Sequence, residues 1–364
     1  MFANFRRVLS DTTPGLRPKV IGIYIFLISV NIALWVLTFL AALTYPFILG
    51  YAVAAYGFGL RHAFDADHIS AIDNVTRKLM QEKKKPVGVG FFFSLGHSTV
   101  VFVMAALIAA GSAAIASNLA NDNSGLKFWG GLIGTTVSAV FLFAIAIMNI
   151  IILVQIVQTF RSVTRGGGYS EEEIEEYLNK RGFFARIFRP LFKTIDKSWK
   201  MYPVGFLFGL GFDTATEVGL LAVSGTVAAT QIPFFVVLLL PLLFTAGMSI
   251  SDTTDGVMML GAYGWAFVKP IRKLFYNMSI TLISVLVALV VGTIETLGII
   301  SGQLNLSGGI WDLVNDASDN FGLVGLGIVG IFIISWAIST IVYKVKKYDD
   351  LEVIKSATPS AAGD

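Results

Sequence analysis

Long apolar runs, separated by polar stretches, form the pattern of this chain. Each run approaches or exceeds the roughly 20 residues that an α-helix needs to cross the hydrocarbon core of a bilayer. The pattern therefore predicts an all-α integral membrane protein with eight transmembrane helices. The runs cover about residues 20–45, 46–78, 87–116, 128–160, 202–228, 233–268, 274–300 and 321–343.

Positive charge alternates between the two ends of these predicted spans. Apart from Arg61 and Lys127, every Lys and Arg lies before the first run, at the end of the second run, or after the second, fourth, sixth or eighth. Because basic loops stay in the cytoplasm, both termini are predicted to be cytoplasmic, which requires an even number of spans. The first run has no small-residue cleavage pattern after it, so we expect it to be retained rather than removed as a signal peptide.

The same pattern divides the chain into five parts. Within the polar stretch in the middle, Ser170 and Glu173 form a capping box that predicts a short helix, and the aromatic and basic residues after it are typical of a segment in the headgroup layer. The predicted parts are a cytoplasmic N-terminal segment (1–19), helices one to four (20–160), a cytoplasmic connector (161–200), helices five to eight (201–343) and a cytoplasmic tail (344–364).

Composition supports a membrane class and narrows the chemistry. Apolar residues make up 55% of the 364 residues and charged residues only 14%, more apolar surface than a soluble domain can bury. The chain has no cysteine, which excludes disulfides and thiolate ligands. Any metal site must therefore use His, carboxylate, amide, hydroxyl or Met donors. We expect membrane lipid and a divalent transition-metal ion as partners, and no nucleic acid.

The most informative stretch lies inside the second run, where two imidazoles and two carboxylates fall within seven residues: His62, Asp65, Asp67 and His68. Ionisable groups at membrane depth are costly and usually mark an ion or proton route. In one continuous helix His62, Asp65 and His68 would share one face, with Asp73 back beside His62, whereas Asp67 would point elsewhere unless the helix unwinds. Imidazole and carboxylate together suit Ni²⁺, Co²⁺ and Zn²⁺. The alternative is an ordinary interfacial helix cap.

The third histidine, His97, lies inside the third run, next to Gly96, Ser98 and Thr99. A lone histidine on an apolar helix can simply be a hydrogen-bonded packing residue. All three histidines of the chain nevertheless lie in or beside polar clusters within predicted spans. We therefore expect His97 to serve the same site as His62 and His68.

Spans five and six carry further intramembrane acids. Asp213 and Glu217 lie one turn apart in the fifth run, and Asp252 and Asp255 three residues apart in the sixth. Such acids need a cation, a proton or a basic partner, and Arg61 is the obvious basic candidate within the spans. The alternative is that these acids are neutral and join helices through hydrogen bonds. Hydroxyl and thioether groups accompany them: Thr214, Thr216, Met248, Ser251 and Thr254.

Four segments together resemble the signature motifs of the nickel/cobalt transporter family. They are RHAFDADHI at 61–69, LGHSTVV at 95–101, LGFDTATE at 210–217 and GMSISDTTD at 247–255. Their order, their positions in spans two, three, five and six and the eight-span topology match as well. The resemblance implies uptake of Ni²⁺ or Co²⁺ across the cytoplasmic (inner) membrane by a single-component permease, and it does not choose between the two metals.

We therefore predict a secondary transporter with Ni²⁺ or Co²⁺ as its substrate and with no prosthetic group. Imidazole coordinates only when it is neutral, so binding should weaken as the pH falls toward about 6. The predicted metal ligands are His62, Asp65, Asp67, His68 and His97. Residues predicted to support these ligands or to line the path are Arg61, Asp73, Asn74, Ser98, Thr99, Asp213, Thr214, Thr216, Glu217, Met248, Ser251, Asp252, Thr254 and Asp255.

Other classes compete with this prediction. The sequence contains no phosphate-binding loop of the Gly-x-x-x-x-Gly-Lys-Ser/Thr type, so it has no recognisable ATP-hydrolysing site. It also contains no His-Glu-x-x-His motif of a metalloprotease. A divalent-cation channel or an efflux protein would use the same residues. An intramembrane aspartyl protease would leave all three histidines without a task. The sequence leaves open the oligomeric state and the use of protons as a coupling ion.

Overall fold

The computed structural model describes residues 15–82, 84–110, 125–164, 195–211, 215–228, 230, 232–266 and 270–346. In these residues the chain is helical and contains no strand, as the sequence predicts. The helices are α2 (Leu16–Ala42), α3 (Ile48–His62), α4 (Ala66–Gln81), α5 (Val89–Ala109), α7 (Gly125–Thr164), η1 (Ser198–Lys200), α10 (Met201–Phe208), η2 (Gly209–Gly211), α11 (Ala215–Ala228), α12 (Phe234–Val237), α13 (Leu239–Ala266), α14 (Pro270–Leu304), α15 (Ile310–Asp319) and α16 (Phe321–Val345).

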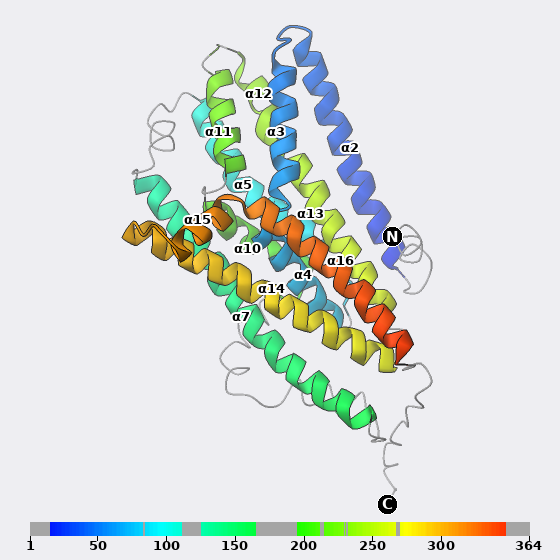
Figure 1. Ribbon diagram of the computed structural model, residues 1–364. Helices are drawn as coiled ribbons and strands as arrows, with labels where there is room; N and C mark the ends of the chain where they lie inside the picture. Colours follow the sequence, from blue (N-terminus) through cyan, green and yellow to red (C-terminus); the bar gives the residue numbers. More distant parts are fainter. Residues whose placement is uncertain are drawn as a thin grey trace, which may run out of the picture.

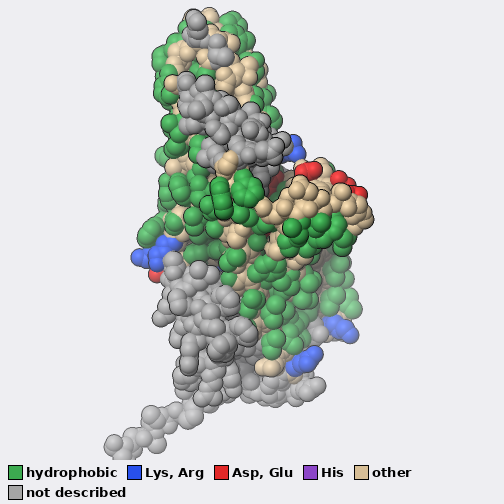
Figure 2. Space-filling view, turned by 90° about the vertical axis from the view of Figure 1, so that its left-hand side faces the viewer, with side chains coloured by type: hydrophobic (Ala, Val, Ile, Leu, Met, Phe, Trp, Pro, Cys, Tyr) green, Lys and Arg blue, Asp and Glu red, His purple; other side chains and the backbone are tan. Residues whose placement is uncertain are grey.

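Six of the described helical stretches are long and apolar enough to cross a membrane, so the protein is a multi-pass membrane protein. The described surface seen in Figure 2 is covered mostly by hydrophobic side chains. On α2, for example, Ile25 and Ile32 are about 60% exposed, as expected of a helix that faces lipid. The six stretches are Leu16–Ala42, Val89–Ala109, Leu132–Gln158, Phe234–Gly261, Met278–Leu304 and Phe321–Val345.

The second predicted span is two helices rather than one. α3 ends at His62 and α4 begins at Ala66, and Asp65 between them has extended backbone angles (φ −65°, ψ 144°). The placement of the motif on one continuous helical face is therefore wrong. Irregular backbone at membrane depth is tolerated only where protein surrounds it or where it lines a cavity. Here Gly325 of α16 allows that helix to pack on the break, because a Cβ at Gly325 would overlap the carbonyl oxygen of Phe64.

The fifth predicted span is also interrupted. α10 ends at Phe208, η2 follows as one tight turn, and α11 begins at Ala215. The predicted path residues Asp213 and Thr214 lie outside the described residues, as does the predicted capped helix of the connector.

Glycines bring two pairs of helices into close contact. Between α3 and α13, a Cβ at Gly59 would overlap the carbonyl of Phe244, and a Cβ at Gly247 would meet the carbonyl of Tyr56. Small residues at such positions let membrane helices approach closely. These contacts fix α13 beside the part of α3 that leads to His62.

The second pair, α5 and α10, repeats this contact. A Cβ at Gly205 would overlap the carbonyl of Phe93, and a Cβ at Gly96 would overlap the carbonyl of Tyr202. The pattern Tyr-x-x-Gly thus occurs in both α3 and α10, and Phe-x-x-Gly in both α5 and α13. In Figure 1 α3 descends from the top of the molecule, whereas α10 leads upward into α11. The two broken spans therefore run in opposite directions and share the Tyr-x-x-Gly pattern.

Two apolar clusters form the interior. One contains buried residues of α3, α11 and α13, including Phe244. The other contains buried residues of α4, α5, α7, α10 and α14, including Phe93 and Phe208. The break between α3 and α4 lies where the two clusters meet, since His62 is 5.7 Å from the ring of Phe244 and His68 is 4.7 Å from the ring of Phe93.

Candidate metal site

The three histidines of the chain come together in the interior. Their ring centroids are 4.7 Å (His62–His68), 4.7 Å (His62–His97) and 4.8 Å (His68–His97) apart. All three side chains are buried, with 1%, 0% and 3% of their surface exposed. Their candidate ligand nitrogens all lie within 4.8 Å of one another. The structure therefore brings His97 together with His62 and His68.

Each imidazole is positioned by a different structural element. His62 is the last residue of α3, His68 lies in the first turn of α4, and His97 lies inside α5. The break at 63–65 turns His68 back toward His62. The close packing of α10 on α5 at Gly96 fixes the position of the neighbouring His97 along the bundle. The cluster thus depends on the helix break as much as on the residue spacing.

The distances suit a transition-metal ion. His62 Nε2 lies 2.9 Å from His97 Nε2. Two nitrogens bound to one ion at about 2.1 Å are about 3.0–3.4 Å apart at bond angles of 90–109°, and at most about 4.2 Å apart. A small inward movement of His68 would therefore complete a three-imidazole site. A bound ion would replace the proton that His62 Nε2 and His97 Nε2 share in their hydrogen bond.

Carboxylates hold two of the rings from behind. His62 Nδ1 lies 2.9 Å from Asp65 Oδ2, and His68 Nδ1 lies 3.3 Å from Asp252 Oδ2. A carboxylate that accepts the Nδ1 proton leaves the lone pair on Nε2, which orients the ring and raises its basicity as a ligand. Thr216 Oγ1 is a further neighbour of His62 Nδ1, at 3.1 Å. Asp65 thus contacts a ligand on the side away from His97.

The fourth ligand candidate is Glu217. Its Oε1 lies 2.8 Å from His97 Nε2 and 4.0 Å from His62 Nε2, and the residue is 1% exposed. It therefore contacts the same ring atoms that face each other in the histidine pair. Sequence reasoning placed Glu217 on the path, and the structure brings it to the histidine cluster itself.

Two ring nitrogens of the cluster have no hydrogen-bond partner within the described part of the chain. They are His68 Nε2 and His97 Nδ1, both buried. An unsatisfied buried polar atom costs about 1–3 kcal/mol. His68 Nε2 is the nitrogen that the Asp252 contact leaves with its lone pair, which is the arrangement expected of a ligand. The donor set of imidazole and carboxylate suits Ni²⁺ and Co²⁺.

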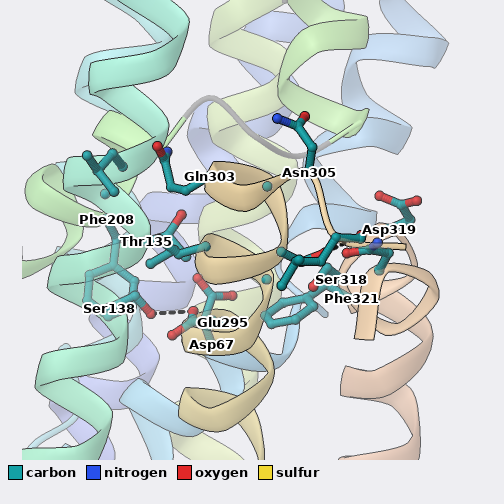
Figure 3. Close-up of a pocket in the computed structure, with 18 residues that line it drawn as sticks. Asp67, Thr135, Ser138, Phe208, Glu295, Gln303, Asn305, Ser318, Asp319 and Phe321 are labelled. Carbon is teal, nitrogen blue, oxygen red and sulfur yellow. Dashed lines mark hydrogen bonds between the residues drawn. The ribbon is translucent and has the colours of Figure 1, made fainter. Parts of the chain in front are cut away.

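The other predicted residues of the broken span, formed by α3 and α4, lie outside the histidine cluster. Arg61 is exposed at the end of α3, and Asp67 is half-buried, with Oδ1 accepting the His68 backbone N–H at 2.9 Å. Asp73 is buried and accepts a hydrogen bond from Ser284 at 2.7 Å, and the side-chain oxygen Oδ1 of Asn74 accepts hydrogen bonds from Arg77 and Asn149. Asp67, predicted as a ligand, lines a cavity together with Glu295 (Figure 3).

The remaining predicted residues lie on α5 and α13. Thr99 lies 2.9 Å from the Tyr202 hydroxyl, Ser98 is buried beside His97, and Thr254 accepts a hydrogen bond from Tyr24. Met248 is fully buried and occupies the position on α13 that His97 occupies on α5. Ser251 and Asp255 are half-buried, with Asp255 one turn beyond Asp252.

Sequence reasoning missed two buried polar residues near the site. Ser138 of α7 donates a hydrogen bond to Glu295 of α14 at 2.6 Å, and both residues are buried. Glu295 is the sole acid in the sequence of α14. An acid inside an apolar run is the same signal that identified Asp213 and Glu217, so Glu295 could have been found from the sequence.

Comparison with known proteins decides the family. The family model described as "High-affinity nickel-transport protein" matches residues 48–342. The chain belongs to this family. It is 49% identical to the "High-affinity nickel transport protein" of Cupriavidus necator over 97% of this chain and 99% of that protein. The resemblance found in the four motifs is thus confirmed over most of the chain.

The similar proteins include transporters named for nickel and one named for cobalt. The chain is 50% identical to the "Nickel transporter NicT" of Mycobacterium tuberculosis, over 84% of this chain and 81% of that protein. It is 39% identical to the "Cobalt transport protein NhlF" of Rhodococcus rhodochrous, over 79% and 81%. No solved structure matches the chain. The family is one of transport proteins, so the protein is not an enzyme, which removes the protease alternative.

Proposed function

We propose that this protein is a secondary transporter that takes up Ni²⁺ or Co²⁺ across the cytoplasmic membrane without hydrolysing ATP. The observation that carries the proposal is the cluster of three buried imidazoles, two of them held by carboxylates. His62, His68, His97 and Glu217 would bind the ion, and Asp65 and Asp252 would orient the rings. The names of the relatives supply the two candidate metals.

The proposed topology has eight spans with both termini in the cytoplasm. The six long helices supply six of the spans, and α3–α4 and α10–α11 supply the other two, each broken near the histidine cluster. Broken helices at the bilayer midplane are where secondary transporters bind their ions. The Lys and Arg residues on one side of the membrane support this orientation.

The membrane potential is sufficient to drive uptake. Moving one charge across 100 mV releases about 2.3 kcal/mol, so a dication gains about 4.6 kcal/mol. On the cytoplasmic side of the cluster, Asp252 and Asp255 on α13 face α4, which carries Asp73. These oxygen ligands would accept the ion as it leaves the imidazoles.

The proposal is tested by uptake of radioactive Ni²⁺ and Co²⁺ into proteoliposomes under an imposed inside-negative potential. Wild-type protein should accumulate at least one of the two metals, and His97→Ala should abolish accumulation at equal protein density. Asp316→Asn, which removes an exposed acid from α15, serves as the control and should behave as wild type. Flux that depends on the histidines but runs outward against this potential would indicate efflux instead. Uptake that survives loss of His97 would refute the site.

A further inference from the structure

A second polar feature lies beside the histidine cluster. A cavity of about 730 Å³ is lined by residues of α7, α14, α15 and the start of α4 (Figure 3). In the proposed topology it opens on the side of the membrane opposite the cytoplasm, because α15 connects the last two spans. Its outer part is lined by Gln303, Asn305 and Asp319.

The inner end of the cavity carries two acids. Glu295 reaches it from α14 and Asp67 from the first turn of α4, and Figure 3 shows their carboxylates directed toward the same space. Glu295 is 5% exposed and accepts the hydrogen bond from Ser138 at 2.6 Å. Two carboxylates that face each other at membrane depth repel unless a cation or a proton lies between them.

The cavity ends against the metal site itself. Asp67 is the residue before His68 and accepts its backbone N–H. Phe208 lines the cavity and contacts the ring of Phe93 at 5.2 Å, and Phe93 in turn contacts the ring of His68 at 4.7 Å. Among the described residues, the start of α4 and this pair of aromatic rings therefore lie between the cavity and the imidazoles.

We infer that this cavity is a loading vestibule in which Glu295 and Asp67 capture the hydrated divalent cation before it passes to the histidine cluster. The inference rests on the proposed transport function and adds Glu295 to the residues that carry it out. Carboxylate and hydroxyl oxygens bind hard or hydrated cations and discriminate little among them. The vestibule would therefore raise the local concentration of dications, whereas selection of the metal would occur at the imidazoles.

The first test measures initial rates of Ni²⁺ uptake in proteoliposomes, with and without millimolar Mg²⁺, for wild type, Glu295→Gln and Asp316→Asn. Glutamine has the shape of glutamate and still accepts from Ser138, so only the charge is lost. We expect Glu295→Gln to raise KM about tenfold, the size of one hydrogen bond to a charged group. Vmax should stay within about twofold, and competition by Mg²⁺ should weaken. Asp316→Asn, the same change on an acid outside the cavity, should match wild type.

The second test does not depend on transport. Mn²⁺ prefers carboxylate and water ligands, so its binding to purified protein, followed by electron paramagnetic resonance, reports on the vestibule. We expect Glu295→Gln to lose this Mn²⁺ site and His97→Ala to retain it. If wild type transported neither Ni²⁺ nor Co²⁺ but kept this pattern, the proposed function would fail and the vestibule would stand.

Three results would overturn the inference. One is a KM and a Mg²⁺ competition in Glu295→Gln equal to those of wild type. Another is a fall in equilibrium Ni²⁺ affinity as large as the rise in KM, which would make Glu295 part of the histidine site. The third is loss of Mn²⁺ binding in His97→Ala. If Glu295→Gln is not produced in folded form, Glu295→Asp, which keeps the charge, should give a KM within threefold of wild type, and a tenfold rise would contradict the inference.

Discussion

The contact between Asp65 and His62 gives the sharpest prediction about the site. Asp65 Oδ2 lies 2.9 Å from His62 Nδ1, and both side chains are buried. In Asp65→Asn the amide oxygen can still accept the Nδ1 proton, so the ring keeps its position while the negative charge behind it is lost. We expect weaker metal binding without loss of the site.

The size of the effect follows from this geometry. Removing a group that orients a metal-bound histidine typically lowers metal affinity 10–100-fold, which corresponds to about 1.4–2.8 kcal/mol. His62→Ala removes a nitrogen that lies 2.9 Å from His97 Nε2 and should cost more than 100-fold. Metal affinity should therefore fall further in His62→Ala than in Asp65→Asn.

Equilibrium binding of radioactive Ni²⁺ to purified protein measures both affinities, and uptake at matched membrane abundance checks their consequence. Asp312→Asn, an exposed acid on α15, is the control for loss of one negative charge. Equal losses in Asp65→Asn and His62→Ala would show that Asp65 binds the ion directly, as the sequence alone predicted. Wild-type affinity in Asp65→Asn would show that the contact has no role in binding.

Three further predictions follow from packing, linkage and protonation. Gly205→Ala should destabilise the protein by about 1–3 kcal/mol, because the new Cβ overlaps the carbonyl of Phe93. The control Gly327→Ala, whose Cβ meets no atom within 4 Å, should be neutral or stabilising. Equal thermal unfolding temperatures of the two variants would refute the contact. Ni²⁺ at 100 times its Kd should stabilise the folded protein by about 2.7 kcal/mol, seen as a higher Tm that a chelator reverses, and the same Tm shift in His97→Ala would count against the site. Ni²⁺ binding should weaken and release protons as the pH falls toward about 6, because imidazole must be neutral to coordinate. Calorimetry in buffers of different ionisation enthalpy measures the protons released, and an affinity that does not change with pH, without proton release, would contradict this prediction.

The sequence was sufficient to predict the helical class and to group the three histidines as a candidate site. Apolar runs of membrane-spanning length predict helices for a reason that needs no tertiary contact, since every backbone polar group in lipid must be satisfied within its own segment. The grouping of His62, His68 and His97 followed from the rarity of ionisable groups at such depth. Six long apolar helices and the buried cluster agree with these predictions.

The break between α3 and α4 could not be predicted in the same way. Residues 63–65 contain neither Gly nor Pro, and the break is held by tertiary contacts, such as Gly325 against the carbonyl of Phe64. This break places Asp65 beside Nδ1 of His62 and directs Asp67 into the cavity with Glu295. Side-chain direction at a helix break depends on the whole packed bundle, whereas residue spacing along the chain gives it only for a continuous helix.

X-ray absorption at the nickel edge of the Ni²⁺-loaded protein tests the three-imidazole site most directly. We predict the multiple-scattering signature of two to three imidazoles with Ni–N distances near 2.1 Å, together with oxygen ligands. The imidazole contribution should fall in His68→Ala, while Asp65→Asn should leave it unchanged. A first shell of oxygen alone, or an imidazole count that is the same in His68→Ala and His97→Ala as in wild type, would contradict it.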